Sequence, residues 1–171
     1  MAIEIERKFL VTGDSWREHV VRQENMRPGY LNRVSADGSK ASVRIRITGD
    51  EAFLNIKEAK TGSSRMEYDY GVPLPDASEM LDALCQQPLI EKTRYIVEYA
   101  GFTWEIDVFH GHNAGLVVAE IELPSEDTVF EKPGWLGREV TAERRYYNAA
   151  LSENPYSDWT ADERQASESN S

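Results

Sequence analysis

The regular pattern of the chain starts with Ile3-Glu4-Ile5-Glu6-Arg7-Lys8, in which apolar and charged side chains alternate. Successive side chains of a β-strand point to opposite faces of a sheet, so this alternation predicts a strand with a charged face and an apolar face. A second stretch, Val43-Arg44-Ile45-Arg46-Ile47, repeats the alternation with two arginines. Both stretches predict strands that place like charges side by side on one face of a sheet.

The same period of two recurs along most of the chain. It predicts eight strands, over residues 2–12, 20–34, 41–49, 52–58, 65–73, 90–100, 102–110 and 116–124. Three helices are expected, a short one after Asp14-Ser15 and two over about 76–87 and 142–153, and 134–137 is expected to be a loop. Eight strands suffice to close a barrel. The predicted fold is therefore α+β: an eight-stranded antiparallel closed β-barrel, a tunnel with a charged interior, covered by a few α-helices.

Length and charge limit the classes of partner. The chain has 171 residues, which favours one domain, and its net charge of -11 disfavours general nucleic-acid binding. The longest unbroken apolar stretch, from Ala114 to Ala119, is far shorter than a membrane span. Cys85 is the single cysteine, so an intrachain disulfide is excluded and a cytoplasmic protein is the simplest expectation. We expect neither a nucleic acid nor a membrane as a partner.

The end of the chain differs in composition from the rest. From Glu153 to Ser171 there are five acidic side chains and one basic side chain, Arg164. Beyond Arg164 the only apolar residue is Ala166, so little surface is available for burial. We therefore expect a folded domain over residues 1–156 and an acidic, disordered tail over 157–171.

The charged face of the predicted sheet is sorted by sign. Arg44 and Arg46 alternate in one strand, and Glu120 and Glu122 alternate in another. A solvated face crossed by salt bridges is one interpretation, but such faces usually mix signs because like charges repel. Paired acids instead favour a divalent cation, and paired bases favour a polyanion. A tunnel with both sets inside fits a polyphosphate complexed with metal, and the acidic surface is then no objection.

At this point the motifs resemble a known family. Glu4-Ile5-Glu6-Arg7-Lys8 is similar to the ExExK signature of the CYTH domain, or triphosphate tunnel metalloenzyme superfamily. Gly29-Tyr30-Leu31 resembles its QGYL segment, with Pro28 in the place of Gln, and Val43-Arg44-Ile45-Arg46 resembles its RxR strand. The remaining elements follow in the family's order: Lys57, Glu67, Lys92-Thr93-Arg94, Asp107 and Glu120-Ile121-Glu122. The similarity spans about Ile3 to Tyr156, and the size resembles short bacterial members that are similar to inorganic triphosphatases.

The resemblance implies a role for each of these side chains. The implied ligands of a divalent metal, Mg²⁺ or Mn²⁺, are Glu4, Glu6 and Glu122, with support from Glu120 and Asp107. The implied phosphate-binding residues are Lys8, Arg44, Arg46, Lys57, Lys92 and Arg94. Lys8 and Tyr30 are the candidates for orienting the attacking water. Each acid has a structural alternative, a salt bridge inside the barrel, and Tyr30 has the alternative of aromatic packing.

These roles lead to one main functional hypothesis. It is metal-dependent hydrolysis of inorganic triphosphate to pyrophosphate and phosphate, by water that a metal activates inside a polar tunnel. The alternatives are a class IV-type adenylyl cyclase, a thiamine or nucleoside triphosphatase, and a non-catalytic polyphosphate-binding module. The last is disfavoured, because pure anion binding has no use for so many carboxylates. A homodimer is compatible with the sequence.

Overall fold

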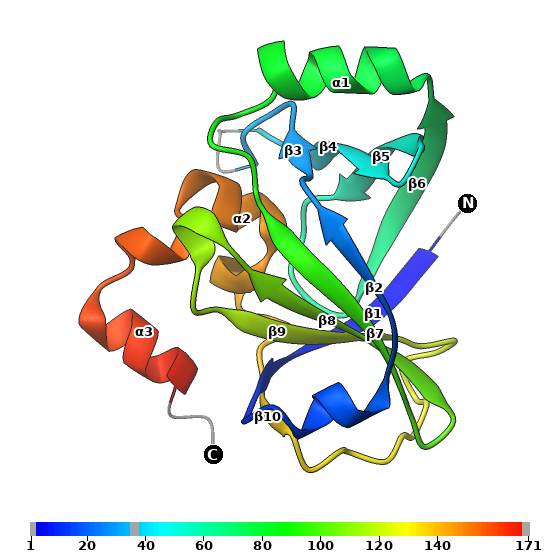
Figure 1. Cartoon of the computed structure of the whole chain (residues 1–171), viewed down its shortest axis with the longest axis vertical. Coiled ribbons are helices and arrows are strands. Elements are labelled where there is room, and N and C mark those ends of the chain that lie inside the picture. Colours follow the sequence, from blue (N-terminus) through cyan, green and yellow to red (C-terminus); the bar gives the residue numbers. More distant parts are fainter. Residues whose placement is uncertain (1–2, 35–37, 169–171) are drawn as a thin grey trace.

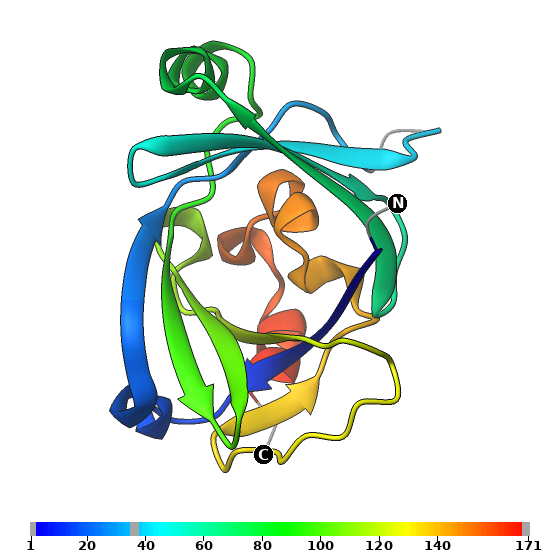
Figure 2. The same ribbon diagram turned by 90° about the vertical axis from the view of Figure 1, so that its right-hand side faces the viewer.

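The computed structural model describes residues 3–34 and 38–168, and it confirms an α+β fold built on an antiparallel sheet. The strands are β1 (Ile3–Val11), β2 (Val20–Met26), β3 (Gly29–Tyr30), β4 (Ala41–Thr48), β5 (Glu51–Glu58), β6 (Ser64–Val72), β7 (Lys92–Tyr99), β8 (Phe102–Phe109), β9 (Val117–Glu122) and β10 (Leu136–Glu139). Their order in the sheet is β2-β7-β8-β9-β1-β6-β5-β4-β3, and β10 pairs with β1 outside this path. The sheet curls around an interior, as Figures 1 and 2 show.

The tunnel architecture is confirmed, but it differs from a fully hydrogen-bonded barrel. The two ends of the strand order, β2 and β3, form no ladder with each other within the described residues. The predicted strand 20–34 is interrupted at Arg27-Pro28, because proline lacks the amide hydrogen that a ladder needs. These two residues are the covalent link between the edges of the sheet. The prediction of one continuous strand over 20–34 is therefore wrong, and the barrel has a short seam between β2 and β3 in place of a closing ladder.

Strand β1 holds three parts of the sheet together. Its first residues, Ile3 to Ile5, pair with β6, and Glu6 to Leu10 pair with β9. Its last part pairs with β10, with Phe9 opposite Glu139 and Val11 opposite Leu136. Strand β10 begins inside the segment that was expected to be a loop. The ExExK stretch therefore lies where three strands converge, which fixes its charged side chains from several sides.

Helices cover the outside of the sheet and one side of its interior (Figures 1 and 2). The α-helices are α1 (Leu74–Ala83), α2 (Asn148–Glu153) and α3 (Ala161–Glu168), and short 3₁₀ helices span Ser15–His19, Gly111–Asn113, Arg144–Tyr146 and Tyr156–Asp158. Helix α1 packs Ala77 and Leu81 on Ile45 of β4. The predicted helix 142–153 is a 3₁₀ turn followed by α2. No helix in the described ranges is long and apolar enough to cross a membrane.

Two aromatic clusters anchor the outer layers. In the first, Trp104 of β8 contacts Phe9 of β1 and Trp135, with ring centroids 5.8 and 5.4 Å apart. The second cluster packs Tyr146 and Tyr156 next to Tyr30. Burial of such large aromatic surfaces supplies much of the driving force for folding. The apolar face of the curled sheet thus points outward into covering layers, and its charged face is left for the interior.

The C-terminal segment differs from the predicted disordered tail. Trp159 is 4% exposed, and its ring lies 4.9 Å from that of Tyr156 and 5.3 Å from that of Tyr146. Helix α3 follows, and Arg164 donates hydrogen bonds to the carbonyls of Tyr156 and Ser157. One buried aromatic anchor therefore outweighs the acidic composition. Residues 169–171 of the predicted tail, and Ala2 of the first predicted strand, lie outside the described residues.

Candidate active site

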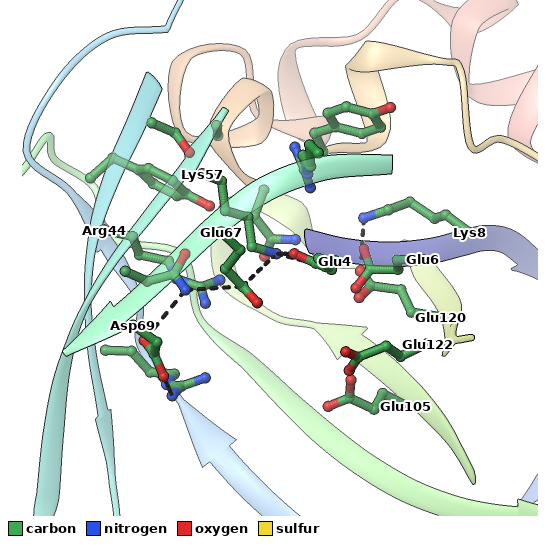
Figure 3. A pocket seen from close by; sticks show the side chains of 18 of the residues that line it. Glu4, Glu6, Lys8, Arg44, Lys57, Glu67, Asp69, Glu105, Glu120 and Glu122 are labelled. Atoms are coloured by element: carbon green, nitrogen blue, oxygen red, sulfur yellow. Dashed lines mark hydrogen bonds and ion pairs between the residues drawn. The ribbon is translucent and has the colours of Figure 1, made fainter. Parts of the chain in front are cut away.

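The charged face of the sheet lines a cavity of about 250 Å³ (Figure 3). Strands β1, β3, β4, β5, β6, β7, β8 and β9 contribute walls, and the start of α2 contributes one side. Of the predicted site residues, those that line the cavity are Glu4, Glu6, Lys8, Tyr30, Arg44, Arg46, Lys57, Arg94, Glu120 and Glu122. The lining residues that were not in the predicted set are Ser42, Asn55, Arg65, Glu67, Asp69, Glu105, Tyr147, Asn148 and Ala149.

The β1–β9 wall contains a buried ion pair. Lys8 lies opposite Glu120 in the two strands, and its Nζ atom is 2.7 Å from Glu120 Oε1. Burial opposes ionisation of Glu120, but Lys8 and Arg94 outweigh it and hold the pKa of Glu120 well below its usual range. Glu120 in turn outweighs burial at Lys8 and raises the pKa of that ammonium. Lys8 is therefore a fixed cation at the wall of the cavity.

A second pair joins β5 to β1. Lys57 Nζ lies 3.0 Å from Glu4 Oε2 and 3.5 Å from Glu67 Oε2. Burial alone would raise the pKa of Glu4, but the charge of Lys57 lowers it to about 2. Glu4 is therefore ionised at neutral pH, and its position is set by a lysine of β5, two strands away in the sheet.

Two further acids are not neutralised by the lysines. Burial raises the pKa of Glu6 well above its usual value, and the charges of Glu120 and Glu4 raise it further. Burial also raises the pKa of Glu122, and Glu4 and Glu67 add to that effect. Figure 3 shows Glu6, Glu120 and Glu122 on the same side of the cavity. Seven carboxyl groups and six cationic side chains line the whole cavity, and the two acids with raised pKa, Glu6 and Glu122, lie together on this side.

This donor set fits a hard divalent cation that binds together with a ligand. No three carboxylate or imidazole groups of the described residues stand close enough to form a complete metal site on their own. Mg²⁺ usually takes only one or two protein carboxylates and completes its shell with phosphate oxygens and water. Repulsion among Glu6, Glu120 and Glu122 is what a cation would relieve. The carboxylates therefore suit a metal that arrives with a polyphosphate.

The opposite wall keeps its arginines available. The Nε atoms of Arg44 and Arg46 are buried and have no hydrogen-bond acceptor among the described residues. Arg46 makes one ion pair, in which its Nη2 lies 3.3 Å from Asp69 Oδ2. Asn55, opposite Arg44, donates hydrogen bonds to Glu67 and Asp69 and so holds these acids. Buried guanidinium groups with unused donor atoms are strong sites for phosphate oxygens.

Two predicted site residues do not line the cavity. Lys92 Nζ lies 2.7 Å from Asp107 Oδ2, and the two side chains are 0% and 2% exposed. Arg94 donates to both oxygens of Asp107, at 2.8 and 2.9 Å. Both carboxylate oxygens are therefore occupied, and Asp107 supports Arg94 instead of facing a ligand. Lys92 also donates to Asn148 of α2, at 2.9 Å.

The residues missed by sequence reasoning fall into two kinds. Arg65 has the same parity as Glu67 and Asp69 in β6, so the period of two could have placed it on the charged face. Tyr147 and Asn148 follow no such period, and their helix was expected to cover the barrel from outside. Tyr30 lines the cavity and is also part of the aromatic cluster, and its predicted role in orienting water stays a prediction.

The curled antiparallel sheet carries crowded carboxylates on one side of the cavity and arginines with unused donor atoms on the other side. This arrangement suits a polyanion that binds together with a metal ion. The protein belongs to the CYTH domain family, whose model matches residues 2–154.

Named relatives and a solved structure agree with this assignment. The chain is 49% identical to the inorganic triphosphatase of Acetivibrio thermocellus, over 91% of this chain and 97% of the relative. It is 37% identical to the inorganic triphosphatase of Nitrosomonas europaea, over 87% of this chain and 96% of the relative. The crystal structure of the inorganic triphosphatase NE1496 matches with a TM-score of 0.64 at 34% identity, over 89% of this chain and 95% of that chain.

Proposed function

We propose that this protein is an inorganic triphosphatase that hydrolyses triphosphate to pyrophosphate and phosphate in a metal-dependent reaction. The observation that carries the proposal is the presence, in one cavity, of arginines with buried, unused Nε donors and of more carboxyl groups than cations. Two relatives at 49% and 37% identity bear the same activity in their names. Metal dependence is general among triphosphate tunnel enzymes of this family.

The cations of the tunnel bind and orient the phosphate chain. Arg44 and Arg46 are free for bidentate contacts to phosphate oxygens. Arg94 is held rigidly, since Asp107 and Glu105 both accept hydrogen bonds from its guanidinium group. Lys57 completes the wall as a point charge. Positioning and charge neutralisation of this kind account for most of phosphoryl-transfer catalysis.

The acids of the tunnel hold the divalent cation, for which we propose Mg²⁺ or Mn²⁺. Glu4, Glu6 and Glu122 are the proposed ligands, and Glu120 supports them while it anchors Lys8. Asp107 is left out of this set, because its oxygens are taken by Arg94 and Lys92. When bound, such a cation neutralises phosphate charge and makes water more acidic.

Lys8 orients the attacking water as a hydrogen-bond donor. Its raised pKa keeps it protonated at neutral pH, so it does not serve as a general base. Tyr30 is 5% exposed and is fixed by the aromatic cluster, which suits a second group of constant position at the cavity wall. Together these side chains restrict the direction from which water reaches the terminal phosphorus.

The test is a product assay with triphosphate, ATP and thiamine triphosphate, each with Mg²⁺ or Mn²⁺. We expect equal amounts of phosphate and pyrophosphate from triphosphate, at a higher kcat/KM than for the two organic substrates. Undiminished phosphate release in excess EDTA would contradict metal dependence. Cyclic AMP as the main product from ATP would favour the adenylyl cyclase alternative, and tight triphosphate binding without turnover would favour a binding module.

A further inference from the structure

A second cavity of about 330 Å³ adjoins the reaction cavity. Its lining residues are Val34, Ser42, Glu58, Ala59, Lys60, Thr61, Arg65, Arg144, Tyr147, Ala149 and Ala150. Four of these, Ser42, Arg65, Tyr147 and Ala149, also line the reaction cavity. The two spaces therefore share a boundary formed by these four residues.

The charge of the second cavity is opposite to that of the first. Its wall carries three cationic side chains, Lys60, Arg65 and Arg144, and one acid, Glu58. That acid is already engaged, because Lys60 Nζ lies 3.5 Å from Glu58 Oε1 and the amide of Met66 donates to the same oxygen. Within the described residues, Arg65 and Arg144 form no ion pair. An anion can be neutralised here by the protein alone, without a metal ion.

The boundary between the cavities is rigid. The Tyr147 hydroxyl donates to the carbonyl of Thr141 and accepts a hydrogen bond from the amide of Gly62, at 3.2 Å for the latter. The guanidinium of Arg65 lies 5.2 Å from the centre of the Tyr147 ring, and Lys8 Nζ lies 5.4 Å from the same centre. Two cations are thus held at set positions against one ring, and each reaches its own side of the boundary.

Arg65 forms no ion pair with the acid that lies opposite it in the sheet. Arg65 lies directly opposite Glu4 in the strand register. The carboxylate of Glu4, however, pairs with Lys57 at 3.0 Å. The positive charge of Arg65 contributes to lowering the pKa of Glu4 but is not consumed by an ion pair, so it can also attract a ligand at the junction.

We propose that the second cavity is a phosphate subsite that works without a metal ion, with Arg65 and Arg144 as its anchors. The proposal rests on the proposed triphosphatase function for the source of its ligand. That ligand is a phosphate group beyond the three in the reaction cavity: either the orthophosphate released by hydrolysis or the fourth group of a longer linear chain. Arg65 lines both cavities, so it contacts the anion in each of them as the anion moves from one to the other.

The first experiment is calorimetric titration of orthophosphate into metal-free protein. Arg144→Gln, which alters an exposed side chain, is expected to weaken binding about tenfold or more, as expected when a charged hydrogen bond is lost. Arg22→Gln removes the same charge from the exposed side of β2 and serves as the matched control, with binding unchanged. Equal affinities in Arg144→Gln and the wild type would overturn the proposal. So would a loss of binding in Arg44→Gln that Arg144→Gln does not share.

The second experiment separates the two sources of phosphate. Ala150 lines the second cavity and not the first, so Ala150→Leu fills the subsite without changing charge. If the subsite takes released phosphate, this variant is less inhibited by added orthophosphate. If it takes a fourth phosphate, the KM for tetraphosphate rises relative to that for triphosphate. If neither quantity changes, the proposal is overturned.

The two experiments also separate this proposal from the proposed function. A protein that hydrolyses triphosphate but has no phosphate binding dependent on Arg144 lacks only the subsite. A protein that binds phosphate through Arg144 but does not hydrolyse triphosphate lacks only the proposed activity.

Discussion

The two walls of the tunnel use their charges in opposite ways. On the wall of β1, β7, β8 and β9, cations pair closely with buried acids: Lys8 with Glu120 at 2.7 Å, and Lys92 and Arg94 with Asp107 at 2.7 and 2.8 Å. On the wall of β4, β5 and β6, the arginines have a single ion pair within the described residues, at 3.3 Å between Arg46 and Asp69. The cations of the first wall, the self-neutralised wall, are paired with acids of the same wall, and these pairs fix its geometry. The arginines of the second wall, the open wall, keep most of their hydrogen-bond donors for a ligand.

The largest expected effect tests the self-neutralised wall. Asp107→Ala leaves Lys92 and Arg94 buried without their carboxylate, and loss of one partner of a buried pair costs about 3–5 kcal/mol. We expect the free energy of unfolding in urea to fall by that amount. The matched control on the other wall is Asp69→Ala, whose side chain is 39% exposed. There the expected loss is about 0–1 kcal/mol, and equal losses in the two variants would contradict the comparison.

The next effect concerns Glu6 of β1, an acid of the self-neutralised wall that has no lysine partner among the described residues. Glu6→Gln removes a proposed metal ligand, and the resulting misplacement of reacting groups is expected to lower turnover about a hundredfold or more. Stability without metal should rise slightly. Burial, Glu120 and Glu4 raise the pKa of Glu6, so ionising it costs stability as pH rises above the carboxyl's usual pKa, and glutamine has no such cost. Thermal melts without metal and turnover with Mg²⁺ measure the two effects. Lower stability with normal turnover would make Glu6 a structural residue.

A smaller effect is expected on the open wall. Arg44→Ala and Arg46→Ala should each raise the KM for triphosphate about tenfold or more, because each removes a charged hydrogen bond to phosphate. Circular dichroism and melting temperature should stay close to those of the wild type, since neither side chain belongs to the apolar core. Unfolding of either variant, with normal polyphosphate binding after refolding, would show that the faces of β4 are assigned wrongly.

The smallest effect is a pH dependence on the self-neutralised wall. Burial lowers the pKa of Lys92 to about 8, although Asp107 opposes the shift. Above pH 8 the folded protein loses this proton before the unfolded chain does, so the contribution of Lys92 to unfolding free energy rises with pH up to the lysine's usual pKa. Between pH 8 and 10, the melting temperature of the wild type should therefore rise relative to that of Lys92→Met. A fall of the wild-type melting temperature relative to that of the variant would contradict the direction of the pKa shift.

Sequence periodicity could place side chains on faces but could not decide which charges neutralise each other. Glu4, Arg44 and Glu122 were expected inside the tunnel because the period of two holds whatever the strands pair with. The role of Asp107 depends on Arg94 lying opposite it in β7, and that register is a long-range feature. The local sequence around Asp107 contains no signal for it.

The sequence indicated three other differences between the predicted and the observed fold to unequal degrees. Pro28 marked the break between β2 and β3, since proline rarely continues a central strand. Trp159 did not predict the ordered C-terminal segment, because one aromatic side chain in an acidic segment is a weak indication of order. Strand β10 has only four residues and depends on β1 for its partner, so short-range pattern could not predict it.

The seam between β2 and β3 sets where the tunnel can change its width. Across every other boundary of the strand path, moving two strands apart breaks a hydrogen-bonded ladder. Across the seam, within the described residues, it breaks none, because Arg27 and Pro28 connect the edges through the chain itself. The circumference is therefore adjustable at the edge next to the arginine wall and constant around β1. The tunnel is therefore a ring that is open at one place: the gap can take up strain, while the proposed metal-binding acids of β1 and β9 on the opposite side keep their spacing.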